Sequence, residues 1–187
     1  MKLRVFDLAL SAVFAALTTV GGFISMPLAF NPVPITLQTL FTYLSGVITG
    51  SVRGGLSQLI YLGIRVSGFS TPSGTVAGPQ ALIGPTGGYL IGFVAAAFII
   101  GKIVEKSRNP RPIRILSSIL IGTTVIYALG ATQLTYYIYS TSNLGPYRSL
   151  QAAVTGGVLP FLLGDTVKTL AASYIAGTKP IAQLRKR

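Results

Sequence analysis

Long apolar runs are the feature that most constrains how this chain can fold. The first extends from about Val5 to Ile24, and further apolar runs follow along the sequence. A run of roughly 17–25 apolar residues is long enough to cross a bilayer as a helix. Only 10% of the residues are charged, whereas about 25% are charged in soluble domains. The sequence therefore predicts an all-α membrane protein.

Prolines, glycines and short polar segments divide these runs into six expected transmembrane helices, packed as one compact bundle and a single domain over residues 1–187. The helices are expected at about residues 5–24, 35–50, 56–69, 89–104, 115–139 and 150–177. At about 1.5 Å per residue, the last is longer than a ~30 Å hydrocarbon core. We therefore expect it to break or bend near Gly156, Gly157 and Pro160.

The basic residues indicate membrane topology. Six helices would put both chain ends on one side of the membrane. Arg65 and Arg148 would lie on the other side and Lys168 inside the bilayer, and the remaining basic residues would lie on the side of the chain ends: Lys2, Arg4, Arg53, Lys102, Lys106, Arg108, Arg111, Arg114, Lys179, Arg185, Lys186 and Arg187. By the positive-inside rule, we expect a multi-pass cell-membrane protein with cytoplasmic termini. The net charge of +12 is thus a topology signal, and we expect no nucleic-acid partner.

The composition argues against several kinds of chemistry. The chain has no cysteine and no histidine, and its only acidic residues are Asp7, Glu105 and Asp165. It therefore lacks thiolate and imidazole ligands and the commonest general base. We expect no metal site, no cofactor and no catalytic residues, and hence a function other than that of an enzyme.

One apolar segment near the C-terminus carries an acid and a base. Asp165 and Lys168 are three residues apart, which places them on the same face of a helix. A charge inside a bilayer costs roughly 3 kcal/mol or more, so charged side chains there face inward and often mark a substrate site. The two could merely neutralise each other. Alternatively they line a cavity open to the outside, where Lys168 binds a carboxylate and Asp165 accepts ligand N–H groups. The second interpretation predicts a small amphipathic acid as the ligand.

Two further regions could contribute to this site. Gln38, in the second expected helix, could hold helices together or reach a ligand; it follows an uncharged loop at residues 25–34 that could act as a lid or rest on its own helix ends. A loop rich in Gly and Pro at residues 70–88 enters the fourth expected helix. Its glycines could expose backbone N–H groups to a ligand or simply allow close packing. The candidate contacts are Thr86, Gly87 and Tyr89.

The first expected helix carries a strip of small residues. Ala12 and Ala16 are four residues apart, and small residues at this spacing let another helix approach closely. The strip could serve packing inside the bundle or the docking of a partner protein.

Three segments together resemble the BioY family, over nearly the whole chain. They are VPITLQTL at residues 33–40, GPTGGYLIG at residues 84–92 and LPFLLGDTVK at residues 159–168. The resemblance implies a six-helix substrate-binding component, or S-component, that captures biotin from outside. It implies partners as well: a transmembrane coupling protein and two ABC-type ATPases, which use the ATP. It further implies that Asp165 and Lys168 contact biotin and that Ala12 and Ala16 contact the coupling protein.

Two other functions are consistent with a membrane bundle. One is a self-sufficient secondary transporter of biotin or another small amphipathic acid, with Asp165 carrying a proton. Such carriers often consist of two inverted halves, and the sequence shows no convincing internal repeat. The other is a membrane enzyme acting on lipids, which the lack of His and Cys makes the weakest of the three.

Overall fold

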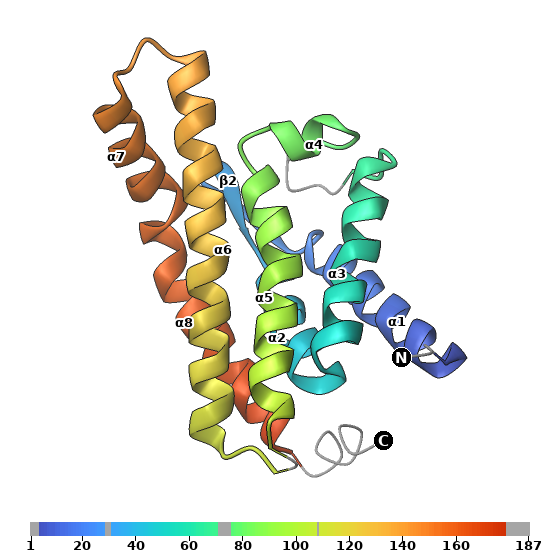
Figure 1. Cartoon of the computed structure of the whole chain (residues 1–187). Coiled ribbons are helices and arrows are strands. Elements are labelled where there is room, and N and C mark those ends of the chain that lie inside the picture. Colours follow the sequence, from blue (N-terminus) through green and yellow to red (C-terminus); the bar gives the residue numbers. More distant parts are fainter. Residues whose placement is uncertain (1–3, 29–30, 71–75, 108, 179–187) are drawn as a thin grey trace.

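The computed structural model describes residues 4–28, 31–70, 76–107 and 109–178, which form a helical bundle with one small hairpin (Figure 1). In chain order the elements are α1 (Val5–Gly21), β1 (Ser25–Leu28), β2 (Asn31–Thr36), α2 (Gln38–Thr49), α3 (Ser51–Val66), α4 (Gln80–Ile83), α5 (Gly87–Glu105), α6 (Pro112–Thr141), α7 (Pro146–Gly157) and α8 (Leu159–Gly177).

Several helices have the length and composition of membrane spans. In the described part of the chain, four stretches qualify: Val5–Phe23, Gly87–Glu105, Pro112–Thr141 and Pro146–Gly177. With 12 and 16 residues, α2 and α3 are shorter than the ~20 residues that an upright span needs. The protein is thus mostly helical, with several helices capable of crossing a membrane. Six crossing helices and cytoplasmic termini stay predictions.

α5 occupies the centre of the bundle, in contact with α2, α3, α4 and α6. Ala96, Ala97 and Ile100 on this helix are fully buried. A Cβ on Gly101 would collide with the backbone of Gly50 and Ser51. Small residues on α5 thus let neighbouring backbones approach closely, which is how helices gain van der Waals contact where the hydrophobic effect is weak.

The second and third expected helices are joined by one residue rather than by a linker at residues 51–55. Gly50 has a φ of 87°, a left-handed conformation that glycine adopts without steric cost. The chain therefore reverses at once, and α3 begins at Ser51 and not near residue 56. Glu105 of α5 accepts hydrogen bonds from the backbone N–H and hydroxyl of Ser51, both at 2.8 Å. These bonds satisfy part of the N-terminus of α3.

The expected loop at residues 25–34 and the start of the second expected helix form an antiparallel hairpin. Its register pairs Ser25 with Thr36, and α2 begins only at Gln38. Val33 and Thr36 are β-branched and favour extended backbone. The residue before a proline, such as Val33, is also biased away from the helical conformation. The prolines, from which a loop was predicted, therefore lie in short strands.

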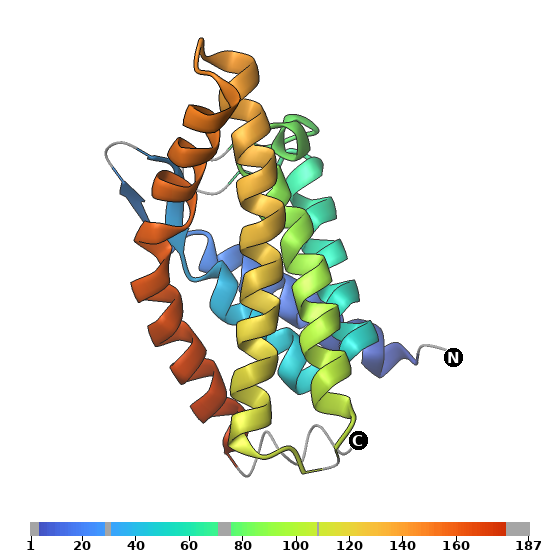
Figure 2. The same cartoon turned by 60° about the vertical axis from the view of Figure 1, so that its left-hand side comes forward.

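The last expected helix, at residues 150–177, is two helices, α7 and α8. The break lies at Val158, whose φ of −125° is not helical, between Gly157 and Pro160. Figure 2 shows α7 diverging from α6 down to this break and α8 running back toward the lower end of α6, whereas α6 and α7 together project beyond the other helices at the top of the view. Because of this break, α7 and α8 run in different directions.

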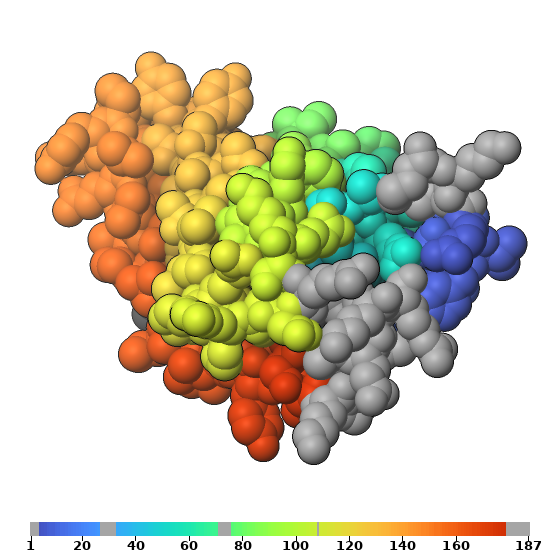
Figure 3. All heavy atoms as spheres, turned by 60° about the horizontal axis from the view of Figure 1, so that its bottom comes forward, coloured from blue at the N-terminus to red at the C-terminus, as the bar shows by residue number. Residues whose placement is uncertain are grey.

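One end of the bundle gathers several helix ends. Figure 3 looks onto it and shows the start of α1 (blue), the α2–α3 turn (cyan), the end of α5 and the start of α6 (yellow-green) and the end of α8 (red). Exposed basic residues lie on the α5 and α6 part of this end: Lys102, Lys106, Arg111 and Arg114.

Candidate functional site

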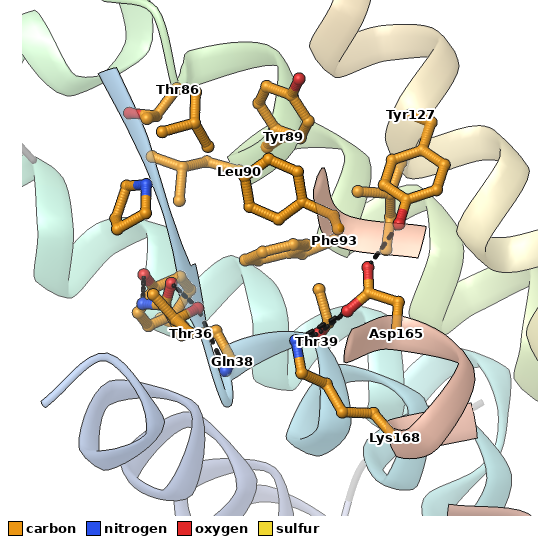
Figure 4. A pocket seen from close by; sticks show the side chains of 15 residues that line it. Thr36, Gln38, Thr39, Thr86, Tyr89, Leu90, Phe93, Tyr127, Asp165 and Lys168 are labelled. Carbon is orange, nitrogen blue, oxygen red and sulfur yellow. Dashed lines mark hydrogen bonds and ion pairs between the residues drawn. The ribbon is translucent and has the colours of Figure 1, made fainter. Parts of the chain in front are cut away.

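A narrow cavity of about 50 Å³ lies between β2, α2, α3, α5, α6 and α8 (Figure 4). Much of its wall is apolar or aromatic, including Val33, Leu90, Phe93, Ile126 and Phe161. Small-molecule sites commonly combine such a wall with a few polar groups that orient the ligand.

Asp165 and Lys168 form one polar end of the cavity. The Lys168 ammonium is 2.7 Å from Oδ1 of Asp165 and donates a second hydrogen bond to the Thr39 hydroxyl at 3.0 Å. Asp165 is 4% exposed and Lys168 is 7% exposed. The two charges neutralise each other. Because both side chains line the cavity, they also face the space that a ligand would fill.

Two residues that the sequence reasoning missed orient the Asp165 carboxylate. The Thr39 hydroxyl donates to Oδ1 at 3.0 Å, and the Tyr127 hydroxyl donates to Oδ2 at 2.7 Å. Tyr127 stands in the middle of an apolar run, far from the tyrosines at the end of α6. A tyrosine hydroxyl buried at such a place needs a polar partner, and that signal was present in the sequence.

The polar atoms of this cluster keep unused hydrogen-bonding capacity. A carboxylate offers about four lone-pair positions and an ammonium three N–H donors. Asp165 accepts from Thr39, Tyr127 and Lys168, and Lys168 donates to Thr39 and Asp165. Each group can therefore form one more hydrogen bond, the carboxylate as an acceptor and the ammonium as a donor.

Gln38 lines the cavity and also ties elements together. Its Nε2 donates to the Tyr61 hydroxyl on α3, and its Oε1 accepts from the Thr36 hydroxyl on β2 at 3.0 Å. Gln38 is 8% exposed. The structural and ligand-facing interpretations of this residue are thus compatible.

The three candidate ligand contacts at the start of α5 differ in their position relative to the cavity. Thr86 and Tyr89 line the cavity, but Gly87 does not. A Cβ on Gly87 would collide with the Leu82 carbonyl and the Gln133 amide, so close packing explains this glycine. Gly87 thus lies outside the cavity lining, and its contact with a ligand stays a prediction. The Tyr89 hydroxyl donates to the Gly157 carbonyl at 2.8 Å, which holds the α7–α8 break against α5.

Three other singled-out residues lie outside the cavity. Ala12 and Ala16 are exposed on α1. Arg65 is 1% exposed, and its guanidinium donates to the carbonyls of Phe69 at 3.2 Å and Val76 at 2.9 Å. Arg65 therefore joins Phe69 and Val76 to the end of α3.

A family model described as the BioY family matches residues 1–184. The biotin transporter BioY of Thermotoga maritima is 36% identical over 166 residues, which cover 89% of this chain and 90% of the relative. The biotin transporter BioY of Rhodobacter capsulatus is 38% identical over 186 residues, covering 96% and 94%. The crystal structure of the S-component for biotin from an ECF-type ABC transporter has a TM-score of 0.77 and 28% identity, covering 98% of this chain and 92% of that one.

Proposed function

The chain belongs to the BioY family, and we propose that it is the S-component that captures biotin for an energy-coupling-factor (ECF) transporter. The observation that carries the proposal is the buried Asp165–Lys168 pair, which faces a largely apolar cavity. Family and fold point to a role other than that of an enzyme. In this proposal the chain binds the vitamin, and partner subunits hydrolyse ATP.

The contact between Asp165 and Lys168 limits which part of biotin they bind. Because their charged groups are 2.7 Å apart, they offer an acceptor and a donor to one small region of a ligand. The biotin ureido group carries a carbonyl oxygen flanked by N–H donors, so Asp165 can accept an N–H while Lys168 donates to the carbonyl. The biotin carboxylate, at the far end of a hydrocarbon tail, does not reach Lys168 in this pose. We therefore propose that Lys168 binds the ureido carbonyl, as an alternative to the carboxylate contact expected from the sequence.

The biotin carboxylate would lie at the opposite side of the cavity, near Thr86. Figure 4 shows Thr86 on one side, Asp165 and Lys168 on the other, and Leu90 and Phe93 between them. Thr86 is the N-cap of α5, and a helix N-terminus favours negative charge. Along α5, Thr86 and Phe93 are roughly 10 Å apart. An extended biotin could thus contact polar groups at both ends and apolar side chains between them.

The hairpin would act as a movable wall. Val33, Pro34 and Thr36 of β2 line the cavity, whose volume of about 50 Å³ is small for a vitamin. We expect β2 to move outward as biotin enters and to close over it afterwards, which agrees with the possible lid at residues 25–34.

The energy would come from partners: a transmembrane coupling protein and two ABC-type ATPases. The exposed strip of Ala12 and Ala16 would receive the coupling protein, because small side chains allow close helix contact. The end of the bundle in Figure 3 would face the cytoplasm, since exposed basic residues gather there and cytoplasmic segments carry an excess of Lys and Arg. The chain ends would lie on the same side.

Biotin uptake into membrane vesicles tests this proposal. Vesicles containing the chain together with the coupling module should take up biotin only when the ATPases have ATP. Uptake by the chain alone, driven by a proton gradient, would favour a self-sufficient secondary transporter instead.

Tyr127→Phe should weaken biotin binding roughly tenfold. A hydrogen bond to a charged group contributes about 1.5–3 kcal/mol, and Asp165 would keep its bonds from Thr39 and Lys168 while losing part of its orientation. Calorimetric titration of the purified variant measures the effect. Tyr136→Phe is the control, since Tyr136 lies on the same helix with its side chain 70% exposed. Normal biotin affinity in Tyr127→Phe would show that its hydroxyl does not orient the site.

A further inference from the structure

Two of the three acidic residues contact the first turn of α3. Glu105 of α5 binds Ser51, as described above, and Asp7 of α1 forms an ion pair with Arg53 at 2.8 Å. The whole length of α2 separates this turn from Gln38 in the cavity. The third acid, Asp165, belongs to the ligand cavity. Asp7 and Arg53 therefore have no direct part in ligand binding.

The Asp7 side of this contact is buried and has supporting bonds, whereas the Arg53 side chain is 20% exposed. Asp7 is 3% exposed, and its Oδ2 accepts the backbone N–H of Arg4 at 2.9 Å. One turn later, the Ser11 hydroxyl lies 2.9 Å from the Asp7 carbonyl oxygen and 3.1 Å from the Arg53 carbonyl oxygen, and it can donate to either. The start of α1 is thus joined to the start of α3 through both the side chain and the backbone of Arg53.

General stability does not explain this pair well. The first turn of a helix is the positive end of its dipole, which favours Asp7 on α1 but disfavours a cation such as Arg53 on α3. A largely buried ion pair also contributes little net stability compared with apolar residues of the same size, because its charges lose much of their hydration. Its better-attested use is to select one arrangement of two elements among several that pack equally well.

In this protein, the ion pair would fix the rotation of α1 about its own axis and its position against α3. Ser11 and Ala15 are buried, while the next residues along the helix, Ala12 and Ala16, are exposed. Neighbouring positions point about 100° apart around a helix, so a modest rotation of α1 would turn the exposed strip away from its present direction. Figures 1 and 2 show α1 crossing the bundle obliquely, outside the cluster formed by α5, α6 and α8.

We infer that the Asp7–Arg53 pair is a positioning device for partner docking, which holds α1 so that the Ala12 and Ala16 strip faces the coupling protein. This inference rests on the proposed function, in which that strip receives the coupling protein. The pair acts through α1 and touches neither biotin nor ATP.

Asp7→Asn in the complete transporter tests the inference. The change keeps the side-chain shape and removes the charge that holds Arg53. We expect the variant to co-purify roughly tenfold less coupling module, a loss within the range of coupling energies between contacting residues, while its biotin dissociation constant changes less than about twofold. The maximal rate of biotin uptake should fall, whereas the biotin concentration at half-maximal uptake should stay the same.

Glu105→Gln is the matched control. It removes the other acid at the first turn of α3 but belongs to α5 and leaves α1 alone, so it should co-purify the module normally. Arg53→Met removes the cation and leaves the bond between Asp7 and the Arg4 N–H in place, so it should lose the module to a similar extent as Asp7→Asn.

Three results would overturn the inference. They are normal co-purification by Asp7→Asn, normal co-purification by Arg53→Met, or loss of biotin binding together with thermal stability in Asp7→Asn. The last result would make the pair part of the bundle core. A separate result would show that the strip does not receive the coupling protein. In that case, the variant with Ala12→Trp and Ala16→Trp would also co-purify the module normally.

Discussion

Lys168→Met is expected to weaken biotin binding about 100-fold. A charged hydrogen-bond partner lost from a dry site costs about 2–5 kcal/mol, and about 2.8 kcal/mol corresponds to that change in affinity. Methionine keeps the side chain up to the position of Cε, so the effect comes from the lost donor and from the charge left unpaired on Asp165. Calorimetry on the purified protein measures it. Lys102→Met, at an exposed lysine of α5, should leave the affinity unchanged.

Two biotin analogues test which end of the vitamin Lys168 contacts. Biotin amide lacks the negative charge of the tail, and thiobiotin carries sulfur, a weaker acceptor, in place of the ureido oxygen. Lys168→Met should weaken biotin and biotin amide by the same factor, and it should reduce the preference for biotin over thiobiotin. If the variant instead lost a preference for biotin over its amide, Lys168 would bind the carboxylate and the pose proposed above would be reversed.

Ala12→Trp combined with Ala16→Trp should abolish ATP-driven biotin uptake while leaving biotin affinity nearly unchanged. Both residues are exposed on α1 and lie outside the cavity lining. Two indole rings would keep a partner helix from approaching, and close approach is what drives helix association in lipid. Co-purification with the coupling module and uptake into vesicles, measured beside biotin titration, separate docking from binding.

A matched pair on α6 controls for added bulk on the lipid-facing surface. Thr124 and Ala128 have the same spacing and are also exposed, so Thr124→Trp with Ala128→Trp should transport normally. Wild-type uptake by the α1 variant would mean that the strip is not a docking surface. Loss of both folding and biotin binding would mean that the strip belongs to the bundle core.

Apolar length predicted the long helices well, because a helix in lipid must be apolar over most of its span. The starts of α1 and α5 lie within two residues of those expected, at Val5 and Gly87. The same reasoning failed between residues 25 and 56. There Gly50 alone reverses the chain, and a hairpin containing prolines replaces a loop. A single left-handed glycine and the pairing of short strands leave little trace in hydrophobicity.

The candidate site was predicted in part. Asp165 and Lys168 were identifiable because charges are rare in an apolar helix, and the structure brings both to the cavity. Thr39 and Tyr127 were missed because a threonine and a tyrosine in apolar runs have ordinary structural roles, and their link to Asp165 joins α2, α6 and α8. Such long-range contacts depend on packing that no local pattern specifies.

Equilibrium binding of biotin to the purified chain, without ATP and without the coupling module, tests the proposed function most directly. The polar groups and apolar wall of the cavity all come from this one chain. We expect calorimetry to show one biotin bound per chain, with a dissociation constant in the micromolar range or tighter. Absence of binding at micromolar biotin, while another vitamin binds to the same preparation, would contradict the assignment of biotin as the ligand.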